Sequence, residues 1–258
     1  MLKVDRASKG VRDLNELFRE RRPFGYFVET NTKTCKRATF AKKNKTVVNE
    51  AAIMCGEIIH NLRSALDHVY WEIVSPFAST ERERKKVQFP FCEEAGRLQK
   101  TVEDRLADRV SPKFFKAIMD LKPHGEPGGN ELLYLIDKLD ILDKHRLLIP
   151  TGDYTRISEQ LLRAQVPDFP QDLSIDCVIF GSNQRDIMWG VPRHVLARID
   201  LGGIRPPTLN QFEKELDVPV DIVFEIGGDG TPRPVIPTLH ALVNVTAKTI
   251  KIIKAAAR

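Results

Sequence analysis

The chain has 258 residues, of which 42% are hydrophobic and 29% charged, a balance typical of a globular rather than a disordered protein. Its longest apolar runs fall far short of the roughly 20 residues of a membrane-spanning helix, and its charged start lacks the apolar core of a secretory signal. The four cysteines are far apart, which disfavours a zinc ribbon or a disulfide framework. We therefore expect a cytoplasmic protein that is not embedded in a membrane.

The net charge of +5 is unevenly distributed. Residues 1–49 contain 13 Lys or Arg and 5 Asp or Glu, a net charge of +8, whereas the remaining residues carry −3. A basic N-terminal region is compatible with a polyanionic partner such as RNA, because electrostatic attraction to phosphates is long-range. The alternative is a solvated surface with no partner.

Residues 1–46 are predicted to form a helix followed by a β-hairpin. The helix covers residues 8–21, where apolar side chains recur on one side, and Pro23 ends it. Residues 24–30 and 36–42 are predicted to form the two strands of the hairpin.

Residues 47–150 are predicted to form a central helical unit. A long helix covers residues 48–74, and shorter helical segments follow near residues 95–110 and 112–121. The last helix of the unit runs from Asn130 to about residue 148. The apolar stripe of the long helix consists of Cys55, Ile58, Ile59, Leu62, Ala65, Leu66, Val69 and Ile73.

Residues 151–258 are predicted to be rich in strands and to be closed by a final helix. The strands are expected at residues 175–180, 195–199 and 218–226, and the helix at residues 238–257. Together these elements predict an α+β fold with a central bundle-like unit, in one compact domain overall.

The long helix has an unusual polar face opposite its apolar stripe. A solvated helix face usually carries Lys and Glu, but this chain has no Lys between Lys45 and Lys85, and the face holds two of the six histidines. We therefore expect the face to pack against another helix or a ligand, or to form a structural polar network. Its residues are Glu57, His60, Asn61, Ser64, Asp67, His68 and Trp71.

Charged residues also interrupt the apolar stripe of the helix that begins after Asn130. Asp143 and Arg146 fall on this stripe, where an unpaired charge would cost several kcal/mol. They could pair with each other, or Arg146 could reach Asp67. The pair is then either a structural ion pair or part of an active site.

Two short blocks resemble a known family. Residues 60–68, with the sequence HNLRSALDH, and residues 143–146, with the sequence DKHR, are similar to blocks in a family of uncharacterised bacterial proteins of similar length. This resemblance covers most of the chain. It implies no activity, because none is attached to that family.

Arg63 and His68 are also similar to the signature of HEPN-type helical nucleases, an Arg followed by a His four to six residues later on one helix. That resemblance implies a metal-independent endoribonuclease without a cofactor. The His would activate the ribose 2′-hydroxyl or protonate the leaving group, and the Arg would stabilise charge on the phosphate. The residues expected to support this pair are His60, Asn61, Ser64, Asp67, Asp143, His145 and Arg146.

The two catalytic candidates lie about 140° apart around a helix, so they cannot form one site without a second chain or helix. We therefore expect a homodimer. A first alternative is a non-enzymatic binding or regulatory module in which the polar faces form a structural network. A second is a metal-dependent hydrolase, because Glu57-x-x-His60 has the spacing of di-metal helical bundles, with further ligands from Asp67, His68, Asp140, Asp143 and His145.

Overall fold

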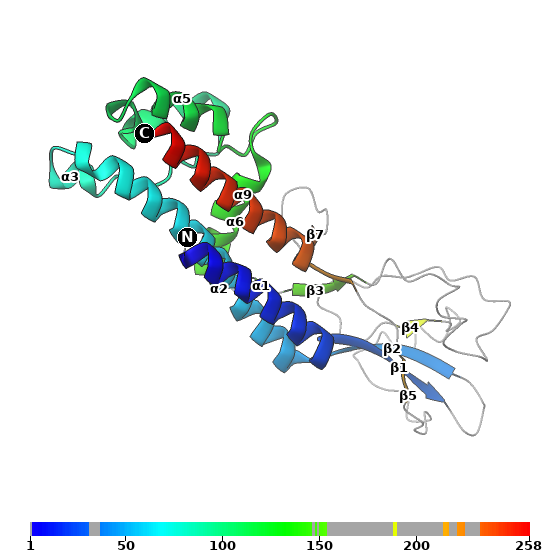
Figure 1. Cartoon of the computed structure of the whole chain (residues 1–258). Coiled ribbons are helices and arrows are strands. Elements are labelled where there is room, and N and C mark those ends of the chain that lie inside the picture. Colours follow the sequence, from blue (N-terminus) through cyan, green and yellow to red (C-terminus); the bar gives the residue numbers. More distant parts are fainter. Residues whose placement is uncertain are drawn as a thin grey trace. The chain divides into compact units, whose positions relative to one another are not determined.

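The structure is a computed structural model. It describes residues 2–30, 37–145, 148, 150–153, 188–189, 214–216, 221–224 and 233–258. The chain divides into two compact units, each of which is built from separated segments (Figure 1). The first unit contains residues 1–16, 51–148 and 235–258, and the second contains residues 17–50 and 149–234.

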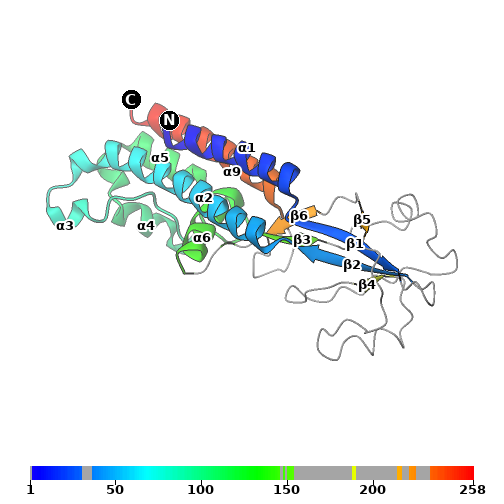
Figure 2. The same ribbon diagram turned by 90° about the horizontal axis from the view of Figure 1, so that it is seen from below.

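Helices dominate the described residues of the first unit, and α9 packs against both α5 and α6 (Figures 1 and 2). The α-helices are α1 (Leu2–Arg21), α2 (Lys45–Val74), α3 (Glu81–Arg84), α4 (Leu98–Asp104), α5 (Pro112–Leu121), α6 (Glu131–His145) and α9 (Val235–Ala256). Three short 3₁₀ turns connect them, η1 (Ser75–Phe77), η2 (Ala95–Arg97) and η3 (Ala107–Arg109).

Side-chain caps fix the starts of two predicted helices. Ser111 accepts a hydrogen bond from the Phe114 backbone N–H, and Asn130 accepts one from that of Leu133. Such caps satisfy amide groups that have no partner within the helix. The predicted helices at residues 112–121 and after Asn130 are therefore confirmed as α5 and α6.

Two helical predictions differ from the structure by more than three residues at one end. Helix α1 begins at Leu2 rather than near residue 8, because Val4 and Ala7 extend its buried stripe toward the N-terminus. The segment at residues 95–110 is not one helix, because Leu106 adopts a left-handed conformation with φ of 66° and separates α4 from η3.

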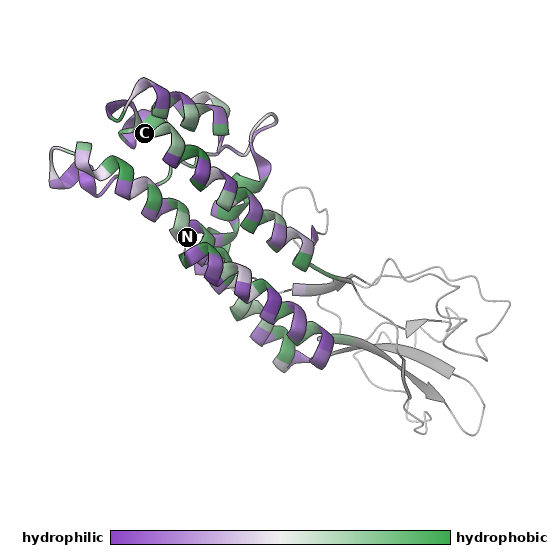
Figure 3. Cartoon of the chain, viewed as in Figure 1, coloured by the Kyte–Doolittle hydropathy of each residue, from purple (hydrophilic) through white to green (hydrophobic). Residues whose placement is uncertain are grey.

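The core of the first unit forms around the apolar stripe of α2. Hydrophobic and hydrophilic segments alternate along the ribbon of this helix (Figure 3). Seven of its eight predicted stripe residues are buried, the exception being Ile73. Tyr70 is fully buried between the rings of Phe89 and Phe114, and its hydroxyl donates to the Arg105 backbone oxygen. Burial raises the pKa of this phenol, so Tyr70 stays neutral in the core.

The second unit contains two small antiparallel sheets. The first has the order β4-β2-β1-β5, and the second the order β3-β6-β7. The strands are β1 (Phe24–Thr30), β2 (Arg37–Lys43), β3 (Pro150–Asp153), β4 (Met188–Trp189), β5 (Lys214–Leu216), β6 (Asp221–Phe224) and β7 (Arg233–Pro234). The predicted strand at residues 218–226 overlaps β6, whereas those at residues 175–180 and 195–199 lie outside the described residues.

Helices α2 and α6 approach each other closely at Gly56. The Asp143 carboxylate lies against this glycine, and a Cβ atom at position 56 would be only 2.6 Å from Asp143 Cγ. Asp143 also accepts a hydrogen bond from the Leu148 backbone N–H, which holds the carboxylate in place. The close approach of the two helices therefore depends on the absence of a side chain at Gly56.

We predict that Gly56→Ala lowers the free energy of unfolding by about 1–2 kcal/mol, because overpacking of the contact outweighs the better helix propensity of alanine. Urea unfolding followed by circular dichroism measures the change. Gly96→Ala is the matched control, since a Cβ at Gly96 would meet nothing within 4 Å. Adding Asp143→Ala should restore stability to the Gly56→Ala variant. A Gly56→Ala protein as stable as the wild type would contradict the close approach.

Candidate functional site

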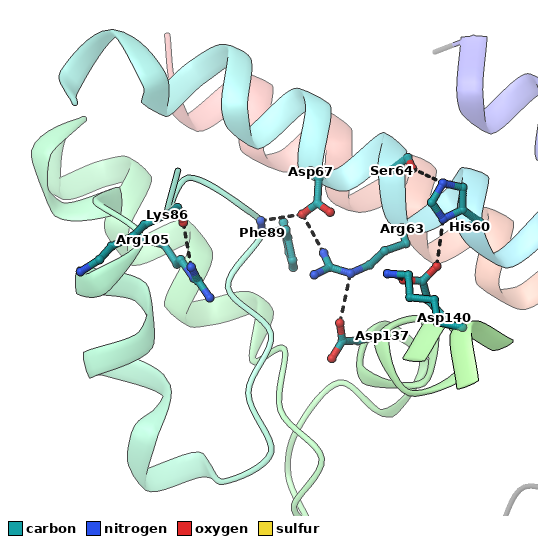
Figure 4. A network of polar contacts seen from close by, with 10 residues as sticks. His60, Arg63, Ser64, Asp67, Lys86, Phe89, Arg105, Asp137 and Asp140 are labelled. Atoms are coloured by element: carbon teal, nitrogen blue, oxygen red, sulfur yellow. Dashed lines mark hydrogen bonds and ion pairs between the residues drawn. The ribbon is translucent and has the colours of Figure 1, made fainter. Parts of the chain in front are cut away.

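The polar face of α2 meets α6 through a network of ion pairs and hydrogen bonds (Figure 4). From α2, His60 contacts Asp140 and Arg63 contacts Asp137. Positions rise along α2 as they fall along α6, so the two helices run antiparallel at this contact. Of the residues expected on the polar face, His60 contacts α6, whereas Glu57, His68 and Trp71 are exposed.

Arg63 is at the centre of this network. Its Nε lies 3.0 Å from Asp137 Oδ1, its Nη1 lies 2.7 Å from Asp67 Oδ1, and its guanidinium stacks 4.4 Å from the centre of the Phe91 ring. The same Asp67 oxygen accepts the Phe89 backbone N–H at 2.8 Å. Only 13% of the Arg63 side chain is exposed. One guanidinium therefore joins α2, α6 and the segment that carries the two phenylalanines.

The positive charge of Arg63 favours the ionised form of the nearby Asp137 carboxylate. Burial raises the pKa of Asp137 from its usual value, the Arg63 charge opposes this rise, and the nearby Asp140 and Asp67 carboxylates add to it. Ionised Asp137 is thus costly in the folded state, and Arg63 offsets part of that cost.

His60 is held in a defined orientation. Its Nδ1 lies 3.1 Å from Asp140 Oδ1 and its Nε2 lies 3.3 Å from the Ser64 hydroxyl. The Asp140 side chain is 3% exposed, and its other oxygen pairs with Lys144 Nζ at 2.6 Å. Because an ionised carboxylate only accepts, Nδ1 is the donor in the contact with Asp140, and Nε2 faces the Ser64 hydroxyl. This is the arrangement by which a carboxylate orients a general-base histidine.

An open depression lies between the start of α1 and the polar face of α2. Its volume of about 650 Å³ falls within the roughly 300–1,000 Å³ that ligand sites occupy. Two cationic side chains and two histidines line it, against a single carboxylate, on Glu57. The lining residues are Leu2, Lys3 and Arg6 from α1 and Glu57, His60, Asn61 and His68 from α2.

The structure separates Arg63 from His68 within one chain. Arg63 points to α6, whereas His68 is exposed in the depression and makes no hydrogen bond or ion pair with the part of the chain that is described. The 140° separation expected from helix geometry is consistent with this placement. Uniting Arg63 with a His68 would need a second chain, and the homodimer stays a prediction.

The supporting residues that were predicted divide into three groups. His60, Ser64 and Asp67 belong to the network, and Asn61 lines the depression. Asp143 contacts Gly56 and accepts from the Leu148 backbone, and His145 is exposed at the end of α6. Arg146 lies outside the described residues, as does any pairing of it.

Sequence reasoning did not assign a role to Asp137, Lys3 or Arg6. Asp137 lies three residues before Asp140 and six before Asp143, and this spacing on one side of a helix is the signal that would have identified it. Lys3 and Arg6 were missed because the first helix was predicted to begin near residue 8, which left both outside it.

The residues proposed for a metal site do not group around one point. In the described ranges, no three His, Cys, Asp or Glu side chains are close enough to hold an ion. Across the same ranges, no helix has the length and apolar character needed to cross a membrane. Comparison with protein-family models, curated proteins and solved structures gives no match.

We predict that Arg63→Met lowers the free energy of unfolding by about 2–4 kcal/mol, because Asp137 and Asp67 would lose their shared cation. Chemical denaturation measures the loss. Arg97→Met is the control: Arg97 is 73% exposed and pairs with the nearby Glu94, so its replacement should change stability by about 0.5 kcal/mol or less. Equal stability of the two variants would show that the network does not hold the helices together.

Proposed function

We propose that this protein is a metal-independent endoribonuclease whose site is the depression between α1 and α2. One observation carries the proposal: two exposed histidines and two cations surround one open depression, and a buried carboxylate orients one of the histidines. The excess of +8 in residues 1–49 supports a polyanionic substrate, because a basic region attracts phosphates.

The groups present are those that RNA cleavage by the 2′-hydroxyl requires. His60 Nε2 takes the proton of the 2′-hydroxyl, and the 2′-oxygen attacks the neighbouring phosphorus. The bond from phosphorus to the 5′-oxygen breaks, and protonated His68 donates a proton to that oxygen. The products are a 2′,3′-cyclic phosphate and a 5′-hydroxyl, while Lys3 and Arg6 stabilise the charge on the phosphate.

This proposal keeps the reaction implied by the HEPN resemblance but changes the residue roles. Arg63 already pairs with two carboxylates, so it supports the helices, and the cationic role passes to Lys3 and Arg6. Asp140 is a positioning residue, since it acts through His60.

A second candidate function is a binding module that holds RNA without cutting it. Arg63 pairs with Asp67 and Asp137 within the chain. These ion pairs favour the binding module, because a network of this kind also serves a purely structural purpose. The two candidates share the depression and differ only in whether the histidines perform chemistry.

We predict that the purified full chain cleaves labelled single-stranded RNA in the presence of EDTA. His60→Ala and His68→Ala should each slow cleavage about 100-fold or more, the usual contribution of an acid or base. His240→Ala is the matched control, since His240 is exposed on α9 and is not among the residues that line the depression. Substrate with a 2′-deoxy sugar at the cut position should not be cleaved.

The other outcomes discriminate among the alternatives. Cleavage that EDTA abolishes would favour the metal-dependent hydrolase. RNA that binds in a salt-dependent way but is never cut would favour the binding module. Cleavage that both histidine variants retain would refute the proposed site.

A further inference from the structure

A tryptophan is exposed one helical turn beyond the depression. Trp71 follows His68 by three residues on α2, which places it on a neighbouring part of the same helix side, about 4.5 Å further along the axis. Its exposed fraction is 52%, whereas the adjacent Tyr70 is fully buried in the core. Trp71 therefore contributes an indole surface to solvent next to the proposed site.

The charges nearby suit an anionic chain that passes along α2. Lys3 and Arg6 lie on the depression, and the carboxylate of Glu72, whose side chain is 70% exposed, lies 3.9 Å from Lys254 Nζ of α9. A flat aromatic surface beside cations is the combination that binds single-stranded nucleic acid, in which bases stack on rings while cations hold the backbone.

We propose that the depression selects single-stranded RNA, with one unpaired base stacked on Trp71 while Lys3 and Arg6 hold the adjoining phosphates. This inference rests on the proposed function, because it names the substrate class of the same site. In a duplex the faces of the bases are covered by their neighbours, so an exposed indole can stack only on an unpaired base. The selectivity should depend little on base identity, since every base has a face to stack.

Tryptophan fluorescence tests this contact directly, because the chain has only two tryptophans, Trp71 and Trp189. In a Trp189→Phe variant, Trp71 is the sole indole. Titration with a short 2′-O-methyl oligouridine, which cannot be cut by 2′-oxygen attack, should quench this fluorescence to saturation. A duplex of the same length should not. If the Trp189→Phe chain does not fold, the difference between wild-type and Trp71→Phe signals gives the same quantity.

Affinity supplies the second measurement. Trp71→Ala should bind the oligouridine roughly tenfold more weakly or worse, the effect of losing one stacked base, and Trp71→Phe should retain most of the affinity. Ile53→Ala is the matched control, since Ile53 is another exposed apolar residue of α2, 54% exposed and outside the depression. Unchanged affinity of Trp71→Ala, or equal quenching by duplex, would overturn the proposal.

A second copy of the chain could instead cover Trp71. Sedimentation of wild type and Trp71→Ala separates this outcome, since a dimer that dissociates on substitution would overturn the stacking proposal. The failure of this inference can also be distinguished from the failure of the proposed function. If Trp71→Ala binds RNA with unchanged affinity and still cuts it, stacking is refuted and the endoribonuclease proposal stands. If the oligouridine quenches Trp71 but RNA is never cut, stacking stands and the endoribonuclease proposal is refuted.

Discussion

The guanidinium of Arg63 is the group on which the first unit depends at the contact between α2 and α6. It lies between the carboxylates of Asp67 and Asp137 and over the ring of Phe91, and little of it reaches solvent. A single cation that serves two acids from different segments specifies a register, because a slip of either helix would leave a partly buried charge without a partner. Gly56 allows the helices to come close enough for this contact.

This constraint also determines which groups remain available for chemistry. With α6 held in place, the buried Asp140 orients His60, and the ring of His60 stays accessible in the depression. His68 lies on the same open side, whereas Arg63 is turned away from it. The same helix thus carries a structural cation on one side and titratable groups on another. A site assembled from His60, His68, Lys3 and Arg6 needs no residue from a second chain.

Sequence patterns predicted the local elements better than the contacts between them. The caps at Ser111 and Asn130 and the stripe of α2 follow from rules that act within a few residues, and they were predicted correctly. The partner of Arg63 was not predicted, because any of several acids had suitable chemistry and only the register of α2 against α6 selects Asp137. The sequence instead suggested that Arg146 pairs with Asp143 or Asp67, and Arg146 lies outside the described part of the chain.

A double-mutant cycle between Arg63 and Asp137 measures whether these two side chains stabilise each other across α2 and α6. The free energy of unfolding is measured for the wild type, Arg63→Met, Asp137→Asn and the double variant. If the two side chains stabilise each other across the helices, the loss caused by Arg63→Met should be smaller by about 1 kcal/mol or more in the Asp137→Asn background. Losses that add to within about 0.5 kcal/mol would contradict the account, because side chains in contact should not act independently.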